Sequence, residues 1–167
     1  MRRLSLSLLL LCVGGCVSDE PGRRPLPAQP ASIQPTTVGV WATPPRDSDA
    51  NGFLDSVDIT VYVSSDQFPA PVHVPGRFTF RLIGADKSVL AQWELDEPAT
   101  TAAMRRNAVG PGYFFRLNVK EVAKDEFEAQ STDLAAEFTP RTGSAVSAPL
   151  TGLRFGRVRP LVQPGRK

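Results

Sequence analysis

The stretch VDITVYV, residues 57–63, alternates apolar and polar side chains with a period of two. Its four aliphatic residues fall on one face of an extended chain, and Asp58, Thr60 and Tyr62 fall on the other. Successive side chains of a β-strand point to opposite sides of the sheet, so this alternation is typical of a strand that is buried on one face only. The segment therefore predicts a strand that lies between a hydrophobic core and solvent.

The same two-residue period returns along the chain, between turn segments rich in glycine and proline. Alternating or β-branched apolar segments occur at VGVWAT (38–43), RFTFRLIG (77–84), VLAQWEL (89–95), YFFRLNV (113–119), LAAEF (134–138) and LRF (153–155). Short strands separated by turns are typical of antiparallel sheets that pack face to face. We therefore expect an all-β domain, an antiparallel β-sandwich of about seven strands.

The four residues GPGY at 110–113 refine this fold class. They resemble the tyrosine corner that leads into a late strand of immunoglobulin-like domains, although the cysteine pair of antibody domains is absent. The resemblance implies an immunoglobulin-like sandwich. Two segments stay open within it. Residues 97–110 have an early proline and a late glycine, which favours a helix but fits a strand as well, and residues 120–129 fit a helical turn.

Directly ahead of the first quoted strand lies the acidic segment DSDANGFLDSVD, residues 47–58. Oxygen-bearing groups occupy alternate places in it, and Gly52 stands at the sixth place, where it permits a sharp turn. The candidate metal ligands, at places 1, 3, 5, 7, 9 and 12, are Asp47, Asp49, Asn51, Phe53 through its carbonyl, Asp55 and Asp58. Alternate groups of a tightly wound loop can converge on one cation, and Ca²⁺ needs six to eight such oxygens.

This spacing resembles the twelve-residue calcium loop of EF-hands over its whole length. The resemblance implies Ca²⁺ as a cofactor. Asp58 replaces the usual glutamate at the last place, which weakens bidentate ligation, and a β segment follows instead of a helix, as in dockerin-like calcium repeats. We therefore expect a structural Ca²⁺ clip and not a calcium sensor. The alternative is a solvated turn without an ion, because Asp, Asn and Gly favour turns.

The N-terminal segment MRRLSLSLLLLCVGGC, residues 1–16, predicts export. Two arginines precede an apolar stretch that is too short to span a bilayer, which is typical of a secretory signal. Val13, two glycines and Cys16 resemble the lipobox of bacterial lipoproteins. The resemblance implies cleavage before Cys16, acylation of its sulfur and, since Val17 follows instead of aspartate, anchoring to the outer membrane of the cell envelope. The alternative is an ordinary secretory signal with an incidental cysteine.

The rest of the chain divides by composition into a tether, one domain and a tail. We assign residues 1–15 to the signal, 16–36 to the lipidated cysteine and a proline-rich tether, 37–158 to the sandwich with its calcium loop at 47–58, and 159–167 to a polar tail. Both cysteines, Cys12 and Cys16, lie near the N-terminus, so the domain is expected to have neither a disulfide nor a thiolate metal site. Such a secreted domain depends on its core or on a metal ion.

The charge of the chain disfavours a nucleic-acid partner. The chain has 19 Lys and Arg residues and 17 Asp and Glu residues, and two of the arginines, Arg2 and Arg3, belong to the signal. The mature chain therefore carries 17 residues of each sign and is formally neutral. Nucleic-acid binding by phosphate neutralisation needs a basic surface, and so does a patch for anionic lipids. We expect the acyl anchor to provide the contact with the membrane.

No catalytic constellation stands out in the sequence. The single histidine, His73, lies in a proline-rich turn without a nucleophile motif beside it. We therefore expect a non-enzymatic envelope protein that acts as a structural or interaction module. The alternative is a carbohydrate-binding module in which Tyr62, on the outward face of its strand, stacks on sugar, with Trp41 as a second ring and Trp93 expected in the core. A hydrolase, the third possibility, would need a pocket that gathers His73 with acids.

Overall fold

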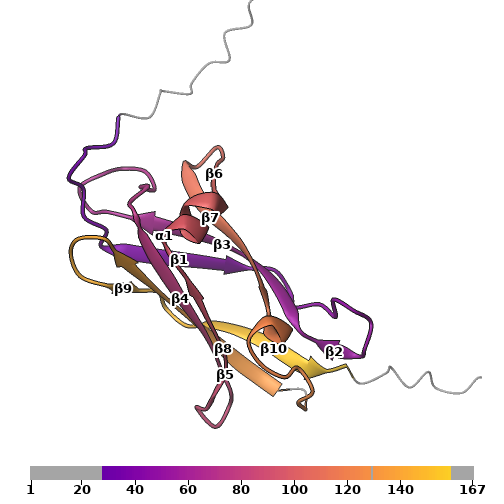
Figure 1. The fold of residues 1–167 in the computed structure, drawn as a ribbon. Helices are drawn as coiled ribbons and strands as arrows, with labels where there is room; N and C mark the ends of the chain where they lie inside the picture. Colours follow the sequence, from indigo (N-terminus) through magenta and orange to yellow (C-terminus); the bar gives the residue numbers. More distant parts are fainter. Residues whose placement is uncertain (1–27, 129, 159–167) are drawn as a thin grey trace, which may run out of the picture.

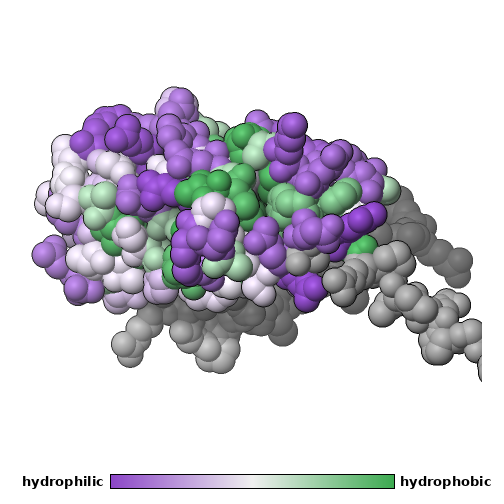
Figure 2. All heavy atoms as spheres, turned by 90° about the horizontal axis from the view of Figure 1, so that it is seen from below, coloured by the Kyte–Doolittle hydropathy of each residue, from purple (hydrophilic) through white to green (hydrophobic). Residues whose placement is uncertain are grey.

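The computed structural model describes residues 28–128 and 130–158, and its two β-sheets pack face to face around a shared core (Figure 1). The expected signal, Cys16, the first part of the tether and the tail at 159–167 lie outside the described residues. No helix in the described part of the chain is long and apolar enough to cross a membrane. Figure 2 shows one face of the molecule, on which hydrophilic residues surround smaller hydrophobic areas.

β-strands dominate the structure. They are β1 (Thr37–Ala42), β2 (Phe53–Leu54), β3 (Ser56–Ser64), β4 (Gly76–Ile83), β5 (Val89–Leu95), β6 (Met104–Arg106), β7 (Pro111–Asn118), β8 (Gln130–Pro140), β9 (Val146–Ser147) and β10 (Thr151–Arg157). The described residues also contain one short helix, α1 (Glu97–Ala103), and one 3-10 turn (Val119–Glu121). The seven strands of six residues or more coincide with the seven apolar segments of the sequence, and β2, β6 and β9 are short additions.

The strand order is that of immunoglobulin-like domains. One sheet has the order β1-β3-β7-β6 and the other the order β2-β10-β8-β4-β5, with β9 added on β8. All the pairs are antiparallel. In chain order, the letters A, B, C, C′, D, E, F and G can be given to β1, β3, β4, β5, β6, β7, β8 and β10. With these letters the two sheets have the orders A-B-E-D and G-F-C-C′, which are those of immunoglobulin-like domains. The expected fold class, an all-β immunoglobulin-like sandwich, is thereby confirmed.

The core lies between the sheets and is built from the inward faces of the strands. The four aliphatic residues of the stretch quoted first are all buried, as their alternation predicts. Phe78 of β4 is at the centre, and its ring centroid lies 5.1 Å from that of Tyr113 and 5.4 Å from that of Phe115, both on β7. On its own sheet it lies 4.8 Å from Phe138 of β8. Because β4 and β7 belong to different sheets, these rings hold the two sheets together.

Tyr113 does not form the tyrosine corner that the segment GPGY resembles. Tyr113 lies in β7, which takes the place of strand E, whereas a tyrosine corner stands near the start of strand F. Its hydroxyl donates to the carbonyl of Val74, in the segment before β4, at 3.4 Å. Burial raises the pKa of Tyr113 to about 12, so the hydroxyl stays protonated and can donate. The residue is therefore a core side chain with one polar contact and not a corner.

The two segments that the sequence left open contain both helix and strand. Asp96 caps α1 by accepting a hydrogen bond from the N–H of Ala99 at 2.9 Å. The helix ends at Ala103 and β6 begins at once, so both alternatives for residues 97–110 occur in part. Within the described residues 120–128, the helical part is limited to the 3-10 turn that begins at Val119.

The folded domain begins earlier in the chain than expected. A boundary at residue 37 would leave Ile33 in the tether, yet Ile33 is 5% exposed and belongs to the core. Gln29 pairs with the backbone of His73 through two hydrogen bonds of 2.8 Å, one donated and one accepted. Residues 29–36 are therefore part of the domain. The chain enters it at the end of the sandwich opposite β2 (Figure 1).

Phe78→Ala is expected to lower the free energy of unfolding by about 3–5 kcal/mol, because it leaves a cavity where the two sheets meet. The matched control is Phe114→Ala, which removes the same ring from a site that is 40% exposed and should cost about 1 kcal/mol or less. Urea denaturation followed by tryptophan fluorescence measures both losses. Equal losses for the two variants would contradict the central position of Phe78.

Candidate metal centre

The acidic segment forms a loop, residues 47–55, between β1 and β3. Its base is closed by Arg46, which donates its N–H to the carbonyl of Ser56 at 2.8 Å and accepts from the N–H of Ser56 at 3.0 Å. Its far side contains β2, which pairs with β10, and the carbonyl of Gly52 accepts from the N–H of Val158 at 2.7 Å. The loop leaves one sheet and is hydrogen-bonded to the other, so it bridges one end of the sandwich.

Within the loop, Asp47 organises the backbone. Its carboxylate accepts hydrogen bonds from the N–H groups of Asp49, Asn51 and Gly52, the last at 2.7 Å. Gly52 has a φ of 88°, a left-handed conformation that favours glycine. The hydrogen bond from Gly52 is the main reason that the pKa of Asp47 lies below its usual range, so this carboxylate is ionised at neutral pH.

Asp55 is fully buried, which is rare for a carboxylate. One of its oxygens accepts from the backbone N–H of Ser48 and the other from the hydroxyl of Ser48, both at 2.9 Å. Its backbone carbonyl accepts from the N–H of Val119 at 2.8 Å, which fixes the loop against the turn after β7. A buried carboxylate is costly unless donors or a cation surround it. Ser48 meets part of this requirement, because each carboxylate oxygen can accept more than one bond.

Three carboxylates converge in this loop. Asp47, Asp49 and Asp55 each present an oxygen, and these oxygens lie within 4.8 Å of one another. Oxygen ligands of Ca²⁺ lie about 2.3–2.6 Å from the ion, so two ligands on opposite sides of it are about 5 Å apart. The three aspartates are therefore spaced so that they could hold a metal ion.

Two residues outside the loop contribute to its charge balance. The ammonium group of Lys120 contacts the carboxylate of Asp49 and lies 3.5 Å from that of Asp125. Asp125 is 6% exposed and accepts a hydrogen bond from the Asn51 amide at 2.8 Å. The bond to Asp49 is the main reason that the pKa of Lys120 lies above its usual range. The spacing of the loop gives no sign of these two residues, which lie 71 and 74 positions from their partners in it.

Two other predicted ligands take part in local backbone structure. The side-chain oxygen of Asn51 accepts from the N–H of Phe53 at 2.9 Å, which closes a tight turn at the tip of the loop. Phe53 itself lies in β2, opposite Arg157 of β10. These contacts hold the loop in the conformation in which the three aspartates meet.

Asp58 lies outside the cluster. Its carboxylate accepts from Arg46 at 2.7 Å and from Arg116 at 2.8 Å, so the structure places it with two arginines and not with the three aspartates. The reason is the element that follows the loop. In an EF-hand a helix returns the last place of the loop to the ion, whereas here residues 56–64 continue as an extended strand. Sequence spacing alone does not reveal this difference in direction.

The residues considered for sugar binding and catalysis lie elsewhere. Trp93 is 4% exposed, as expected, and its indole N–H donates to a backbone carbonyl at 3.1 Å. Trp41 and Tyr62 lie together on the outer face of the first sheet, with ring centroids 5.3 Å apart and nearly perpendicular planes. His73 packs 6.1 Å from the ring of Tyr113. Among the described residues, no cluster of three His, Cys, Asp or Glu side chains includes it.

Comparisons with known proteins assign no family to this chain. No protein-family model matches the chain, and no curated protein matches it.

Asp58→Asn is expected to lower stability at neutral pH and to have little effect in acid. Hydrogen bonds from Arg116 and then Arg46 hold the pKa of Asp58 below its usual range, so folding favours the charged form. This contribution is present above the unfolded pKa of about 4 and is lost as pH falls through the lower folded value. Because the pairs are exposed to solvent, the loss at neutral pH should be about 1 kcal/mol or less.

Urea unfolding of the wild type and of Asp58→Asn, at neutral pH and at about pH 2, measures the effect. Other aspartates also titrate in this range, so the quantity of interest is the difference between the two proteins and not the slope of either one. A difference that stays the same at both pH values would contradict the pairing of Asp58 with the two arginines.

Proposed function

We propose that the chain is a lipid-anchored protein of the cell envelope, whose β-sandwich carries a structural Ca²⁺ ion in the loop 47–55 and serves as a structural or interaction module. The observation that carries the proposal is the convergence of Asp47, Asp49 and Asp55 within 4.8 Å. They meet in a loop that is hydrogen-bonded to both sheets. The proposal assigns the chain no catalytic role.

The donor set of the cluster favours Ca²⁺. All three candidate ligands are carboxylate oxygens, which suit Ca²⁺ and Mg²⁺, whereas Zn²⁺ and Cu²⁺ prefer imidazole or thiolate. Mg²⁺ demands near-octahedral geometry at shorter distances, while Ca²⁺ accepts the irregular geometry of a loop. Water would supply the ligands that the three aspartates do not.

A cation at this site would act on stability. Three carboxylates in one short loop repel one another, and Lys120 supplies a single opposite charge. A divalent cation would neutralise the cluster and hold the loop, which connects the start of β3 to β10. It would also have to displace the ammonium of Lys120 from Asp49, which weakens binding. We therefore expect an affinity typical of extracellular modules, about 10⁻⁴–10⁻³ M.

The lipid anchor rests on the N-terminal sequence. The two arginines, the apolar stretch and Cys16 resemble a lipoprotein signal, and more than one acyl chain would hold the protein firmly on a membrane. The described chain begins, at residue 28, at the end of the sandwich opposite β2 (Figure 1). An anchor at Cys16 would therefore leave the acidic loop at the end of the domain away from the attachment point.

Millimolar Ca²⁺ is expected to raise the melting temperature of the protein. For a Kd of about 1 mM, 10 mM Ca²⁺ adds about 1.4 kcal/mol to the free energy of unfolding, which is a rise of roughly 5 °C. Asp49→Asn should abolish this rise and still fold, because the Asp49 carboxylate pairs with Lys120 at the surface. Thermal melts in Ca²⁺, in Mg²⁺ and in chelator measure the shift.

The matched control for this experiment is Asp58→Asn, which removes one aspartate of the same segment from outside the cluster. It should keep the full response to Ca²⁺. Identical wild-type melts in Ca²⁺ and in chelator would exclude the ion, and so would a full response in Asp49→Asn. An equal loss of response in both variants would show that general acidity of the segment, and not a defined site, is responsible.

Cys16→Ser is expected to release the protein from membranes and to abolish incorporation of labelled fatty acid, because the acyl chains on its sulfur provide the attachment. Cys12→Ser, four positions earlier in the signal, is the matched control and should leave both unchanged. Membrane fractionation and the intact mass of the purified protein measure the outcome. A Cys16→Ser protein that stays acylated on membranes would refute the anchor.

A further inference from the structure

The outer face of the sheet β1-β3-β7-β6 carries three neighbouring aromatic side chains, of which Trp41 and Phe114 are exposed and Tyr62 is half-buried. Trp41 of β1 lies opposite Thr60 of β3, which in turn lies opposite Phe114 of β7. Trp41 is 62% exposed and Phe114 is 40% exposed. Tyr62 follows Thr60 by two positions and so points to the same side, next to Trp41. Adjacent large rings left in water mark a contact surface, unlike single apolar residues scattered over a protein.

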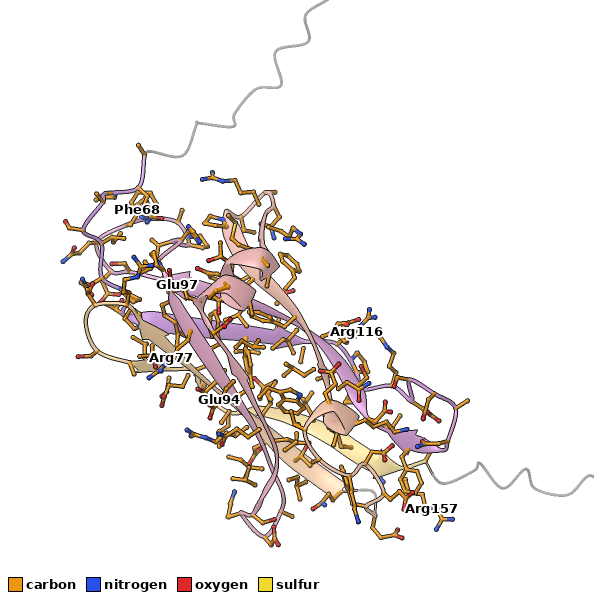
Figure 3. The ribbon with its side chains drawn as sticks, viewed as in Figure 1. Phe68, Arg77, Glu94, Glu97, Arg116 and Arg157 are labelled. Atoms are coloured by element: carbon orange, nitrogen blue, oxygen red, sulfur yellow. The ribbon has the colours of Figure 1, made fainter. Side chains whose placement is uncertain are left out.

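The outer face of the other sheet has a different character. Arg77 of β4 and Glu94 of β5 project from neighbouring strands there (Figure 3), and Arg81 hydrogen-bonds to Gln92 at 3.2 Å. Charged and amide side chains of this kind form an ordinary solvated face. The aromatic group is therefore a property of one sheet and not of the surface in general.

Two glycines make room for the aromatic rings. A Cβ at Gly39, on β1, would come 2.9 Å from the indole ring of Trp41. A Cβ at Gly112, on β7, would come 2.9 Å from the ring of Tyr62. Both rings thus lie against bare backbone, as aromatic residues do beside glycines in sheets. Because the glycines have no side chains, the backbone beside the rings is uncovered and the surface of the sheet is recessed there.

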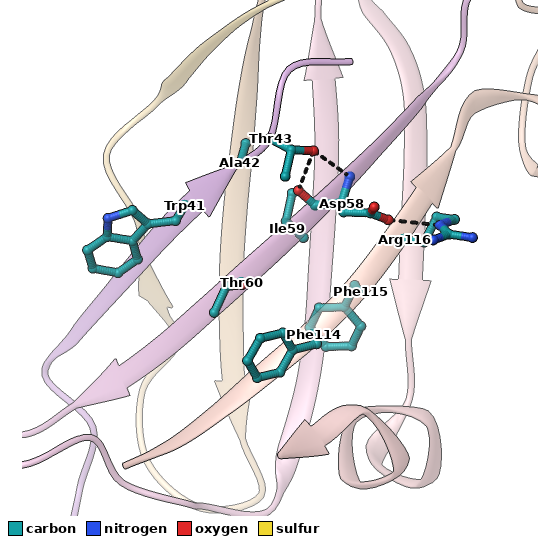
Figure 4. Close-up of a pocket in the computed structure, with 9 residues that line it drawn as sticks. All are labelled: Trp41, Ala42, Thr43, Asp58, Ile59, Thr60, Phe114, Phe115 and Arg116. Carbon is teal, nitrogen blue, oxygen red and sulfur yellow. Dashed lines mark hydrogen bonds and ion pairs between the residues drawn. The ribbon is translucent and has the colours of Figure 1, made fainter. Parts of the chain in front are cut away.

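Two shallow depressions adjoin along this face, and Trp41 and Thr60 line both of them. The first, of about 520 Å³, extends to Phe114 and Arg116. Figure 4 shows Trp41 and Phe114 on either side of Thr60, with Arg116 further along β7. The second, of about 550 Å³, extends to Tyr62. They share Trp41 and Thr60, so together they form one shallow groove that is open to solvent.

One end of the groove has an excess of positive charge. Arg46 and Arg116 both contact Asp58, so two guanidinium groups share one carboxylate. Their side chains are 45% and 66% exposed, which leaves N–H donors within reach of a ligand. Arg105 of β6 lies opposite Gly112, but it lines neither depression, and its guanidinium donates to the carbonyls of Ala102 and Met104.

We propose that this groove binds an acidic polysaccharide. The apolar faces of its sugar rings pack on the three aromatic residues, and a carboxylate lies toward Arg116. Aromatic side chains of this kind offer large apolar area beside polar groups. A guanidinium group binds a carboxylate through two parallel N–H bonds. A groove with aromatic residues along it and a cationic end suits a charged polymer better than one small molecule.

Two other occupants fit the groove less well. A second copy of the chain would present the same face, on which Asp58 is already paired with two arginines, so it offers them no further carboxylate. A single-stranded nucleic acid also stacks its bases on aromatic residues, but it needs a basic track for its backbone. Of the residues that line the two depressions, Arg116 is the one basic residue, so they offer no continuous track. Both occupants are outcomes of the test.

The test uses the full chain in detergent and three carboxylated polysaccharides, namely polygalacturonate, alginate and hyaluronate, with binding measured by titration calorimetry. The neutral comparison is polygalacturonate with methyl-esterified carboxylates, which has the same sugar backbone without the charge. We expect binding to at least one acidic polymer and binding to the esterified polymer that is weaker by about tenfold or more. Raising the salt concentration should also weaken binding to the acidic polymer.

Trp41→Ala and Arg116→Gln are each expected to weaken binding by about tenfold or more, and Arg116→Gln should also reduce the dependence on salt. The control is Val89→Ala on β5, whose side chain is 55% exposed on the other sheet, and it should bind as the wild type does. Asp49→Asn should also bind normally, so this proposal and the cation proposal fail separately.

Several results would overturn the proposal. These are no binding to any of the three polymers, equal binding to the acidic and esterified polymers, and unchanged binding by Trp41→Ala. Tighter binding to single-stranded DNA would assign the groove to nucleic acid instead. A dimer in solution that Trp41→Ala dissociates would assign it to a second copy of the chain.

Discussion

The contact of Phe78 with aromatic rings from both sheets is the constraint on which the rest of this molecule depends. Each strand places alternate side chains inward and outward, so packing of the inward residues also fixes what every strand presents to solvent. β3 makes this coupling plain. It begins immediately after Asp55 of the acidic loop, and it carries Asp58 and Tyr62 on its outer face while its aliphatic residues enter the core. One strand therefore positions both surfaces to which we assign a role.

The acidic loop is joined to this framework through a buried carboxylate. Asp55 is fully buried, receives two hydrogen bonds from Ser48 and is tied through its backbone to Val119. Burial of such a group is tolerated only where its surroundings compensate for the lost water. A cation between the three aspartates would supply that compensation, and Lys120 supplies part of it through Asp49. In our proposals, the acidic end of the sandwich contributes to stability and the aromatic groove to recognition.

Sequence periodicity predicted the fold well because it reports a local property, the side of a strand on which a residue falls. The loop spacing likewise identified Asp47, Asp49 and Asp55, which converge through the turn at Gly52. It failed for Asp58, whose direction depends on a strand where the EF-hand has a helix. It also missed Lys120, which depends on where β7 ends relative to the loop. The groove needed the register between strands, since no local pattern indicates which residues of β1, β3 and β7 become neighbours.

The described chain enters the sandwich at one end and leaves it at the other (Figure 1). β1, at the entry, and β10, at the exit, belong to different sheets. Tension applied between residues 28 and 158 would therefore run nearly along the strands. The ladder hydrogen bonds of antiparallel strands are perpendicular to that direction, so they would resist in shear, all at once, and would not peel apart one by one. A domain that is attached at one end and bound at the other would transmit tension between the two ends without unfolding.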